Sequence, residues 1–114
     1  MITQPGLAGE LEQEMALIKN DLEESVKTQN YEVLDEFLDN ALDLIYYVDA
    51  GTKQLMGFDV GVTVGGPNIN LVYSRGRCEL RGAWGGVNTV MDVDNAVCEE
   101  ILERVSLDFH YYYH

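Results

Sequence analysis

The first half of the chain places apolar residues at every third or fourth position, which is the period of an α-helix with one buried stripe. One such stretch runs from about Leu7 to Lys27, and a second runs from Tyr31 to about Val48. Residues 28–30 interrupt the pattern, and Asn30 is a suitable N-cap for the second stretch. We therefore predict two consecutive helices, the second of which ends at Asp49-Ala50-Gly51 because glycine favours helix termination.

Beyond Gly51 the apolar residues alternate with polar or small ones, which is the period of a strand with one buried face. Short glycine-containing turns separate the alternating runs, so we predict an antiparallel meander. A short run at residues 89–93 is the candidate for a fourth strand, and the predicted sheet therefore has three to four strands. The main alternating runs cover residues 56–64, 69–73 and 78–84.

The last part of the chain returns to the helical period. Asp94 is expected to cap a helix from Asn95 to about Leu107, with Val97 and Ile101 on its buried side. The tail, residues 109–114, has the sequence FHYYYH. We expect this tail to form either an edge strand or a docked aromatic end.

These elements predict a single α+β domain over residues 1–114, with two N-terminal helices, an antiparallel sheet of three to four strands and a C-terminal helix. A chain of 114 residues is long enough to enclose one hydrophobic core. The helices are expected to cover one face of the sheet, and residues 1–6 and 108–114 are expected to be loose ends.

The net charge is strongly negative and unevenly distributed. Twenty acidic residues against seven basic ones give −13 at pH 7. Such a field repels nucleic acid and anionic membranes and attracts basic protein surfaces, so we expect no direct nucleic-acid or membrane binding. Residues 1–50 carry twelve acids against two lysines, whereas residues 51–87 carry two acids against four basic residues. The acidity is thus concentrated outside the predicted sheet, and solubility alone is the competing explanation for it.

The predicted second helix carries a row of acids on its outer face. The row advances in steps of three and four residues, so its carboxylates stack along one side. Because like charges at this spacing weaken a helix by about 0.2–0.5 kcal/mol per pair, the row indicates a role in binding. With acids of the first helix, we expect it to bind lysines and arginines of a basic partner. The predicted partner-binding residues are Glu32, Asp35, Glu36, Asp39 and Asp43, with Glu10, Glu14, Asp21 and Glu24.

The open face of the sheet is a secondary candidate surface. Small residues at Gly57 and Gly61 would make this face flat and accessible to another backbone, whereas the alternative is a face that only contacts solvent. Two arginines flank the hairpin tip at Gly76 and would suit an acidic partner or a phosphate. The residues of this face and tip are Asp59, Asn70, Arg75, Arg77 and Arg81.

The sequence contains no constellation for catalysis or metal binding. The only histidines, His110 and His114, lie in the last five residues, so a nucleophile–base pair would require the tail to fold back. Cys78 and Cys98 lack a second pair at zinc-ligand spacing, and we expect them to be free thiols. No basic segment followed by an apolar stretch is present at the N-terminus, which predicts no signal peptide. We therefore expect a cytoplasmic protein without enzymatic activity, metal or cofactor.

The small size, the acidic helices and two glycine-rich turns together support a resemblance. The turns are Gly65-Gly66-Pro67-Asn68-Ile69 and Trp84-Gly85-Gly86. With these features the chain resembles small acidic proteins encoded by phages and mobile elements, among them the anti-CRISPR and anti-restriction inhibitors. The resemblance implies a nucleic-acid mimic in the host-cell cytoplasm. Such an inhibitor would block the nucleic-acid-binding surface of a CRISPR effector or another nuclease.

Two other functions stay open at this point. The chain could be a structural or regulatory interaction module that self-associates through its sheet face or a strand edge, so both a monomer and a homodimer are compatible with the sequence. It could also be a small-ligand binder or an enzyme that uses the tyrosine- and histidine-rich tail.

Overall fold

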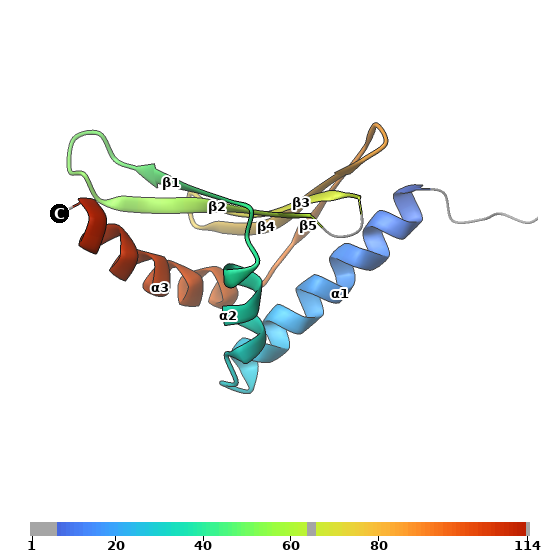
Figure 1. Ribbon diagram of the computed structural model, residues 1–114, viewed down its shortest axis with the longest axis horizontal. Helices are drawn as coiled ribbons and strands as arrows, with labels where there is room; N and C mark the ends of the chain where they lie inside the picture. Colours follow the sequence, from blue (N-terminus) through green and yellow to red (C-terminus); the bar gives the residue numbers. More distant parts are fainter. Residues whose placement is uncertain (1–6, 64–65, 114) are drawn as a thin grey trace, which may run out of the picture.

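Three helices and five strands are present in the part of the chain that the computed structural model describes, residues 7–63 and 66–113. The helices all lie on one side of a single antiparallel sheet (Figure 1). This arrangement confirms the predicted α+β class and the predicted covering of one sheet face. In chain order the elements are α1 (Leu7–Lys27), α2 (Glu32–Asp39), β1 (Asp43–Val48), β2 (Leu55–Thr63), β3 (Asn68–Ser74), β4 (Arg77–Trp84), β5 (Val87–Asp92) and α3 (Asn95–Tyr113).

The sheet is a meander in which each strand pairs with the next, in the order β1-β2-β3-β4-β5. The register places Phe58 opposite Tyr73 and Leu71 opposite Leu80, so these side chains project from the same face. That face meets the helices, whereas none of the three described helices lies over the other face (Figure 1). The predicted meander is confirmed. It has five strands because β1 was not predicted and the candidate fourth strand is present as β5.

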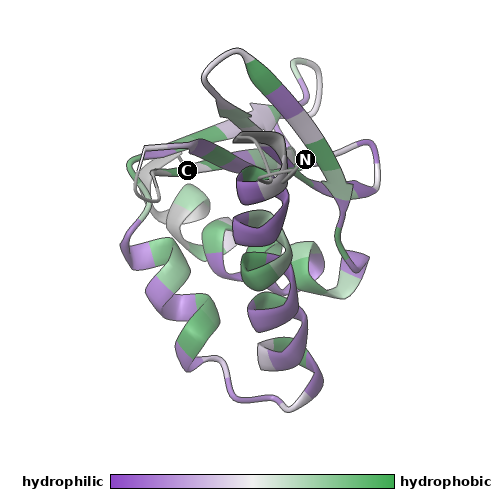
Figure 2. Ribbon diagram, turned by 90° about the vertical axis from the view of Figure 1, so that its right-hand side faces the viewer, coloured by the Kyte–Doolittle hydropathy of each residue, from purple (hydrophilic) through white to green (hydrophobic). Residues whose placement is uncertain are grey.

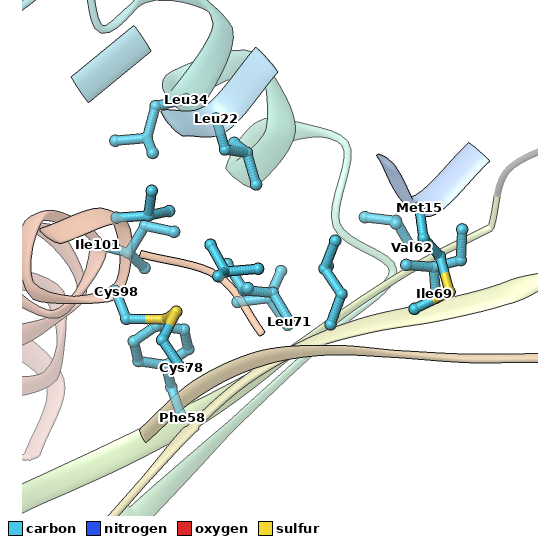
Figure 3. Packing of buried hydrophobic residues seen from close by; sticks show 14 of the residues in the cluster. Met15, Leu22, Leu34, Phe58, Val62, Ile69, Leu71, Cys78, Cys98 and Ile101 are labelled. Carbon is cyan, nitrogen blue, oxygen red and sulfur yellow. A yellow bond between two sulfur atoms is a disulfide. The ribbon is translucent and has the colours of Figure 1, made fainter. Parts of the chain in front are cut away.

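The hydrophobic core lies between the sheet and the inner stripes of the helices (Figure 3). Leu22 of α1 and Leu34 of α2 point toward Ile101 of α3, while Met15 of α1 lies against Ile69 of β3 (Figure 3). All five side chains are buried. Removing such apolar surface from water is the main favourable term in folding, and it fixes both N-terminal helices relative to the sheet.

Helix α1 approaches β4 closely at Gly82. A Cβ atom at this position would lie 2.6 Å from Sδ of Met15 and 2.9 Å from Cδ1 of Leu11. A larger residue would force the side chains of Met15 and Leu11 to shift, and such a close approach is a common reason for glycine inside a strand. The contact holds the N-terminal half of α1 against the sheet.

A disulfide joins Cys78 of β4 to Cys98 of α3 inside this core (Figure 3). The two Cα atoms are 5.9 Å apart, within the usual range for bridged cysteines, and both residues are buried. The expectation of free thiols was therefore wrong. Cys78 projects from the helix-facing side of the sheet and Cys98 from the inward side of α3, so the fold brings the two sulfur atoms together.

The second predicted helix is shorter than expected, and its C-terminal part is a strand. Helix α2 ends at Asp39, with Asn40 as its C-cap, and residues 43–48 form β1. Strand β1 contains Leu44-Ile45-Tyr46-Tyr47-Val48, a run of mostly β-branched and aromatic residues that favours extended backbone. Pairing with β2 then supplies hydrogen bonds along one edge of this run. Asp43 therefore belongs to the sheet and not to the acidic helix face.

The residues around β1 differ from the prediction in exposure as well as in secondary structure. Leu42 and Ile45, which a continued helix would bury, are both exposed. Asp49-Ala50-Gly51 is part of the turn between β1 and β2 and does not end a helix. Oδ1 of Asp49 accepts hydrogen bonds from the backbone N–H groups of Gly51 at 2.9 Å and Thr52 at 2.8 Å, which closes this turn.

Helix α3 begins as predicted and ends later. Oδ1 of Asp94 accepts a hydrogen bond from the backbone N–H of Ala96 at 2.9 Å, which confirms Asp94 as its cap. The helix continues to Tyr113, so residues 108–113 form neither a loose end nor an edge strand. Phe109 is buried and its ring meets Tyr46 edge-on, with centroids 5.4 Å apart. The predicted N-terminal loose end, residues 1–6, lies outside the described residues, as does His114.

Candidate functional site

Helices α1 and α2 form a hairpin with a groove between them. The connection is tightened by Ser25, whose buried hydroxyl donates a hydrogen bond of 2.6 Å to the backbone carbonyl of Asn30. Tyr31 occupies the N-cap position of α2, one residue after the predicted cap. Oδ1 of Asn30 nevertheless accepts a hydrogen bond from the backbone N–H of Glu32 at 3.3 Å. The groove has a volume of about 300 Å³ and is lined by Ile18, Asp21, Leu22, Val33, Glu36, Phe37 and Asn40.

The apolar side chains that line this groove are together called its floor. It consists mainly of Ile18 on α1 and of Val33 and Phe37, one turn apart on α2. Val33 is 44% exposed, whereas its neighbour Leu34 is completely buried in the core. Sequence reasoning identified the acids but missed this floor. The signal that could have found it is the position of Val33, at the edge of the helical stripe beside the predicted acidic row.

The rim of the groove brings together two of the predicted partner-binding acids. Asp21 comes from α1 and Glu36 from α2, and both are exposed. Glu32 and Asp39 are also exposed on the outward side of α2. Among the described residues, no ion pair reaches any of these four carboxylates, so they are available to a basic partner. Asp21 belongs to a helix, α1, on which hydrophilic residues recur at successive turns (Figure 2).

Asp35, by contrast, already has a basic neighbour. Its Oδ1 accepts a hydrogen bond of 2.9 Å from Nε of Arg104 on α3. Arg104 also pairs with Glu100, and its guanidinium lies 4.6 Å from the centre of the Tyr31 ring, a distance suited to a cation–π contact. Hydrogen bonding to Glu100, and then to Asp35, raises the pKa of Arg104 above its ordinary value. Asp35 therefore helps to fasten α2 to α3.

The remaining predicted acids lie away from the groove. Asp43 is the first residue of β1. Glu10, Glu14 and Glu24 lie on α1 but do not line the groove, and Glu24 borders a separate hollow together with Asp94. They add to the negative field of the molecule, and a field of surface charges steers a basic partner even without direct contact.

The residues of the secondary candidate face lie on one side of the sheet but already bind one another. The register places Gly61 opposite Asn70 and Asn70 opposite Arg81, so the predicted shared face is confirmed. Nδ2 of Asn70 donates a hydrogen bond of 2.7 Å to Oδ1 of Asp59. Arg81 forms an ion pair of 2.7 Å with Glu79, and this hydrogen bond raises the pKa of Arg81. Arg81 is therefore already paired, so this face offers little positive charge to an anion.

The hairpin tip between β3 and β4 is no stronger as an anion site. Arg75 has a positive φ of 54°, which a tight turn requires. Arg77 forms an exposed ion pair of 3.4 Å with Asp92 of β5. The sheet face beyond the tip contains a hollow of about 380 Å³, and its lining includes Asp59, Asn70 and Arg81. The α1–α2 groove is therefore the better candidate site.

The described residues contain no group of three or more histidine, cysteine or acidic side chains placed to hold a metal ion. No helix in that part of the chain is both long and apolar enough to cross a membrane.

Comparison with known proteins returned no match among protein-family models, curated proteins or solved structures. The resemblance to anti-CRISPR and anti-restriction inhibitors therefore stays a hypothesis.

Proposed function

We propose that this protein is a non-enzymatic inhibitor that binds a basic protein surface through the groove between α1 and α2. The observation that supports the proposal is the composition of the groove, an apolar floor of Val33 and Phe37 between the exposed carboxylates of Asp21 and Glu36. An apolar floor with an acidic rim suits a segment that presents one apolar anchor flanked by lysines or arginines.

The two parts of the groove have different physical roles. Carboxylates on the rim and on the outward side of α2 accelerate encounter with a positively charged surface and set its orientation. Each exposed ion pair contributes only about 0.2–1 kcal/mol. Burial of an anchor against Val33 and Phe37 supplies affinity that does not depend on salt. Binding is therefore expected to be salt-sensitive but not abolished by salt.

The partner that best fits these features is the nucleic-acid-binding surface of a host defence nuclease, such as a CRISPR effector. Such surfaces are rich in lysine and arginine, because these residues neutralise phosphates. A chain with a net charge of −13 would occupy that surface in place of nucleic acid. This step draws on the acidity of the chain and on the hypothetical resemblance to phage inhibitors.

The proposal can be tested in a cleavage assay. Purified RNA-guided effectors and restriction nucleases are incubated with the protein before DNA is added, and the rate of cleavage is measured. We expect inhibition by the native chain and a weaker effect of the rim variant Asp21→Asn/Glu36→Gln. The control Glu12→Gln/Glu103→Gln removes the same charge from exposed positions outside the groove, so it should inhibit normally.

A floor variant separates the two contributions. Val33→Ser removes the anchor contact at a position already 44% exposed, so the fold should tolerate it. Its inhibition should weaken at every salt concentration, whereas the rim variant should lose mainly the salt dependence. If the native chain inhibits no enzyme of either class, the nuclease assignment is wrong. If both rim and control variants behave alike, the groove is not the binding site.

A further inference from the structure

Several of the exposed apolar side chains of the described residues lie together on β1, at the edge of the sheet. Strand β1 pairs only with β2, so the backbone groups along its other edge face no strand of the described sheet. Leu44, Ile45 and Val48 are all exposed, and Ile45 is 53% accessible to solvent. An exposed apolar strand at the edge of a sheet is a template for pairing with another chain.

A hollow runs along this edge, next to the C-terminal part of α3. It has a volume of about 730 Å³, more than twice that of the α1–α2 groove. Its wall includes the buried ring of Phe109 from α3, which packs against Tyr46. The lining residues are Leu44, Ile45, Tyr46, Val48, Lys53 and Phe109, and the single charged group among them is basic.

The other edge of the sheet differs in composition. Strand β5 alternates exposed Asn88, Val90 and Asp92 with half-buried residues, so its exposed side is largely polar. Strand β1 instead presents apolar side chains on both faces, Leu44 and Val48 toward the helices and Ile45 away from them. An edge that is apolar on both faces is poorly protected against pairing.

The charge distribution indicates which chain can occupy this edge. Two copies with a net charge of −13 repel each other over most of their surfaces. Residues 44–48 carry no acid, and the acid at the far end of β1, Asp49, is tied into its own turn by hydrogen bonds from Gly51 and Thr52. This edge is therefore a region where a second copy can approach without placing acids directly opposite one another.

We propose that two copies of this chain pair β1 with β1 in antiparallel orientation, so that one sheet continues through a two-fold symmetric dimer. A two-fold axis normal to the sheet keeps the helices of both copies on the same side and places apolar residues opposite apolar residues. Antiparallel pairing also brings the β1–β2 turn of one copy beside the start of β1 in the other. Lys53 of each copy then lies near Asp43 of the second copy, and the pair forms twice.

The oligomeric state in solution tests this inference. Sedimentation and light scattering should give twice the chain mass at high protein concentration, with the dimer strengthened by salt because salt screens the mutual repulsion. Ile45→Glu places a carboxylate at the proposed interface and should weaken dimerisation by about tenfold or more. Val90→Glu adds the same charge to a 60% exposed residue of β5 and should leave the dimer intact. Circular dichroism should show that both variants are folded.

A charge exchange adds a second test. Asp43→Lys and Lys53→Glu should each weaken the dimer, and the double variant should restore it. The inference is wrong if the protein is a monomer at all concentrations, if Ile45→Glu does not weaken the dimer, or if Val90→Glu abolishes it. It is also wrong if β1 of a monomer binds an apolar strand peptide instead of a second copy. This test is independent of the proposed inhibition, because the groove variants leave β1 unchanged. Salt is also expected to strengthen the dimer and to weaken the binding of a basic partner.

Discussion

Asp21 of α1 and Glu36 of α2 lie on the rim of one groove, although they belong to different helices and the α1–α2 connection lies between them in the sequence. This relationship depends on the buried contacts that hold the two helices, since Leu22 and Leu34 fix them in the same core. Several features of the packing can be tested without knowledge of the partner, and the groove itself can be tested with a simple probe.

The close approach of α1 to the sheet predicts the effect of Gly82→Ala. The added methyl group would overlap Met15 and Leu11, so the free energy of unfolding should fall by about 1–3 kcal/mol, as is usual for overpacked cores. Urea denaturation measures the change. The cost should be smaller when Met15→Ala is already present, because that substitution makes room. An equal cost in both backgrounds would show that the helix does not press on Gly82.

The disulfide predicts a redox-dependent stability. Cys78 and Cys98 are separated by 20 residues, and a loop of that size is worth roughly 3 kcal/mol when closed covalently. Reductant, or the double variant Cys78→Ala/Cys98→Ala, should lower the free energy of unfolding by about this amount in a denaturant titration. Two free thiols in the untreated native protein, found by thiol titration, would contradict the bridge.

The ion pairs predict unequal roles for two arginines. Arg104 is only 26% exposed, pairs with Asp35 and Glu100, and lies over the Tyr31 ring. Arg104→Gln should therefore cost about 1–2 kcal/mol of stability in thermal or urea denaturation. Arg77→Gln, at a 70% exposed residue with a single distant partner, should cost less than about 0.5 kcal/mol. Similar losses of stability in the two variants would show that Arg104 does not hold α2 against α3.

The β1–β2 turn predicts a pH effect. Hydrogen bonds from the backbone and side chain of Thr52, and from the backbone of Gly51, hold the pKa of Asp49 below its ordinary value of 3.8. Because the folded pKa is depressed, the stabilisation is present above the ordinary value and is lost as pH falls through the folded pKa. Asp49→Ala should therefore be less stable than the native chain at neutral pH, and the difference should shrink in acid. A difference independent of pH would exclude this role.

The sequence predicted well those segments in which the apolar residues follow a single period, either that of a helix or that of a strand. Helix α1 has the predicted bounds, since its apolar stripe is regular from one end to the other. Strands β2 to β4 and their shared open face also follow from strict alternation. In these segments a single burial pattern satisfies both local backbone geometry and the core.

The errors arose where local pattern left a choice that tertiary contacts decide. The run through Ala41 and Ile45 fits a helical stripe as well as a strand, and pairing with β2 selects the strand. The spacing of Cys78 and Cys98 says nothing about whether the two meet. Only the docking of α3 on β4 brings them together.

The candidate site was predicted in part for the same reason. Exposed acids such as Asp21 and Glu36 can be recognised from their place outside the apolar stripe. Tertiary packing decides the rest. It places Asp21 and Glu36 on the same groove, puts Asp43 in β1 and brings Asp35 to Arg104.

The most direct test of the central claim is the affinity of the protein for an arginine-rich helical peptide with a single leucine anchor, measured by calorimetry at low and high salt. The account predicts that Asp21→Asn/Glu36→Gln weakens binding about tenfold at low salt, while Glu12→Gln/Glu103→Gln changes it by less than about twofold. Equal weakening by the two variants would show that net charge alone, and not the α1–α2 groove, attracts basic partners.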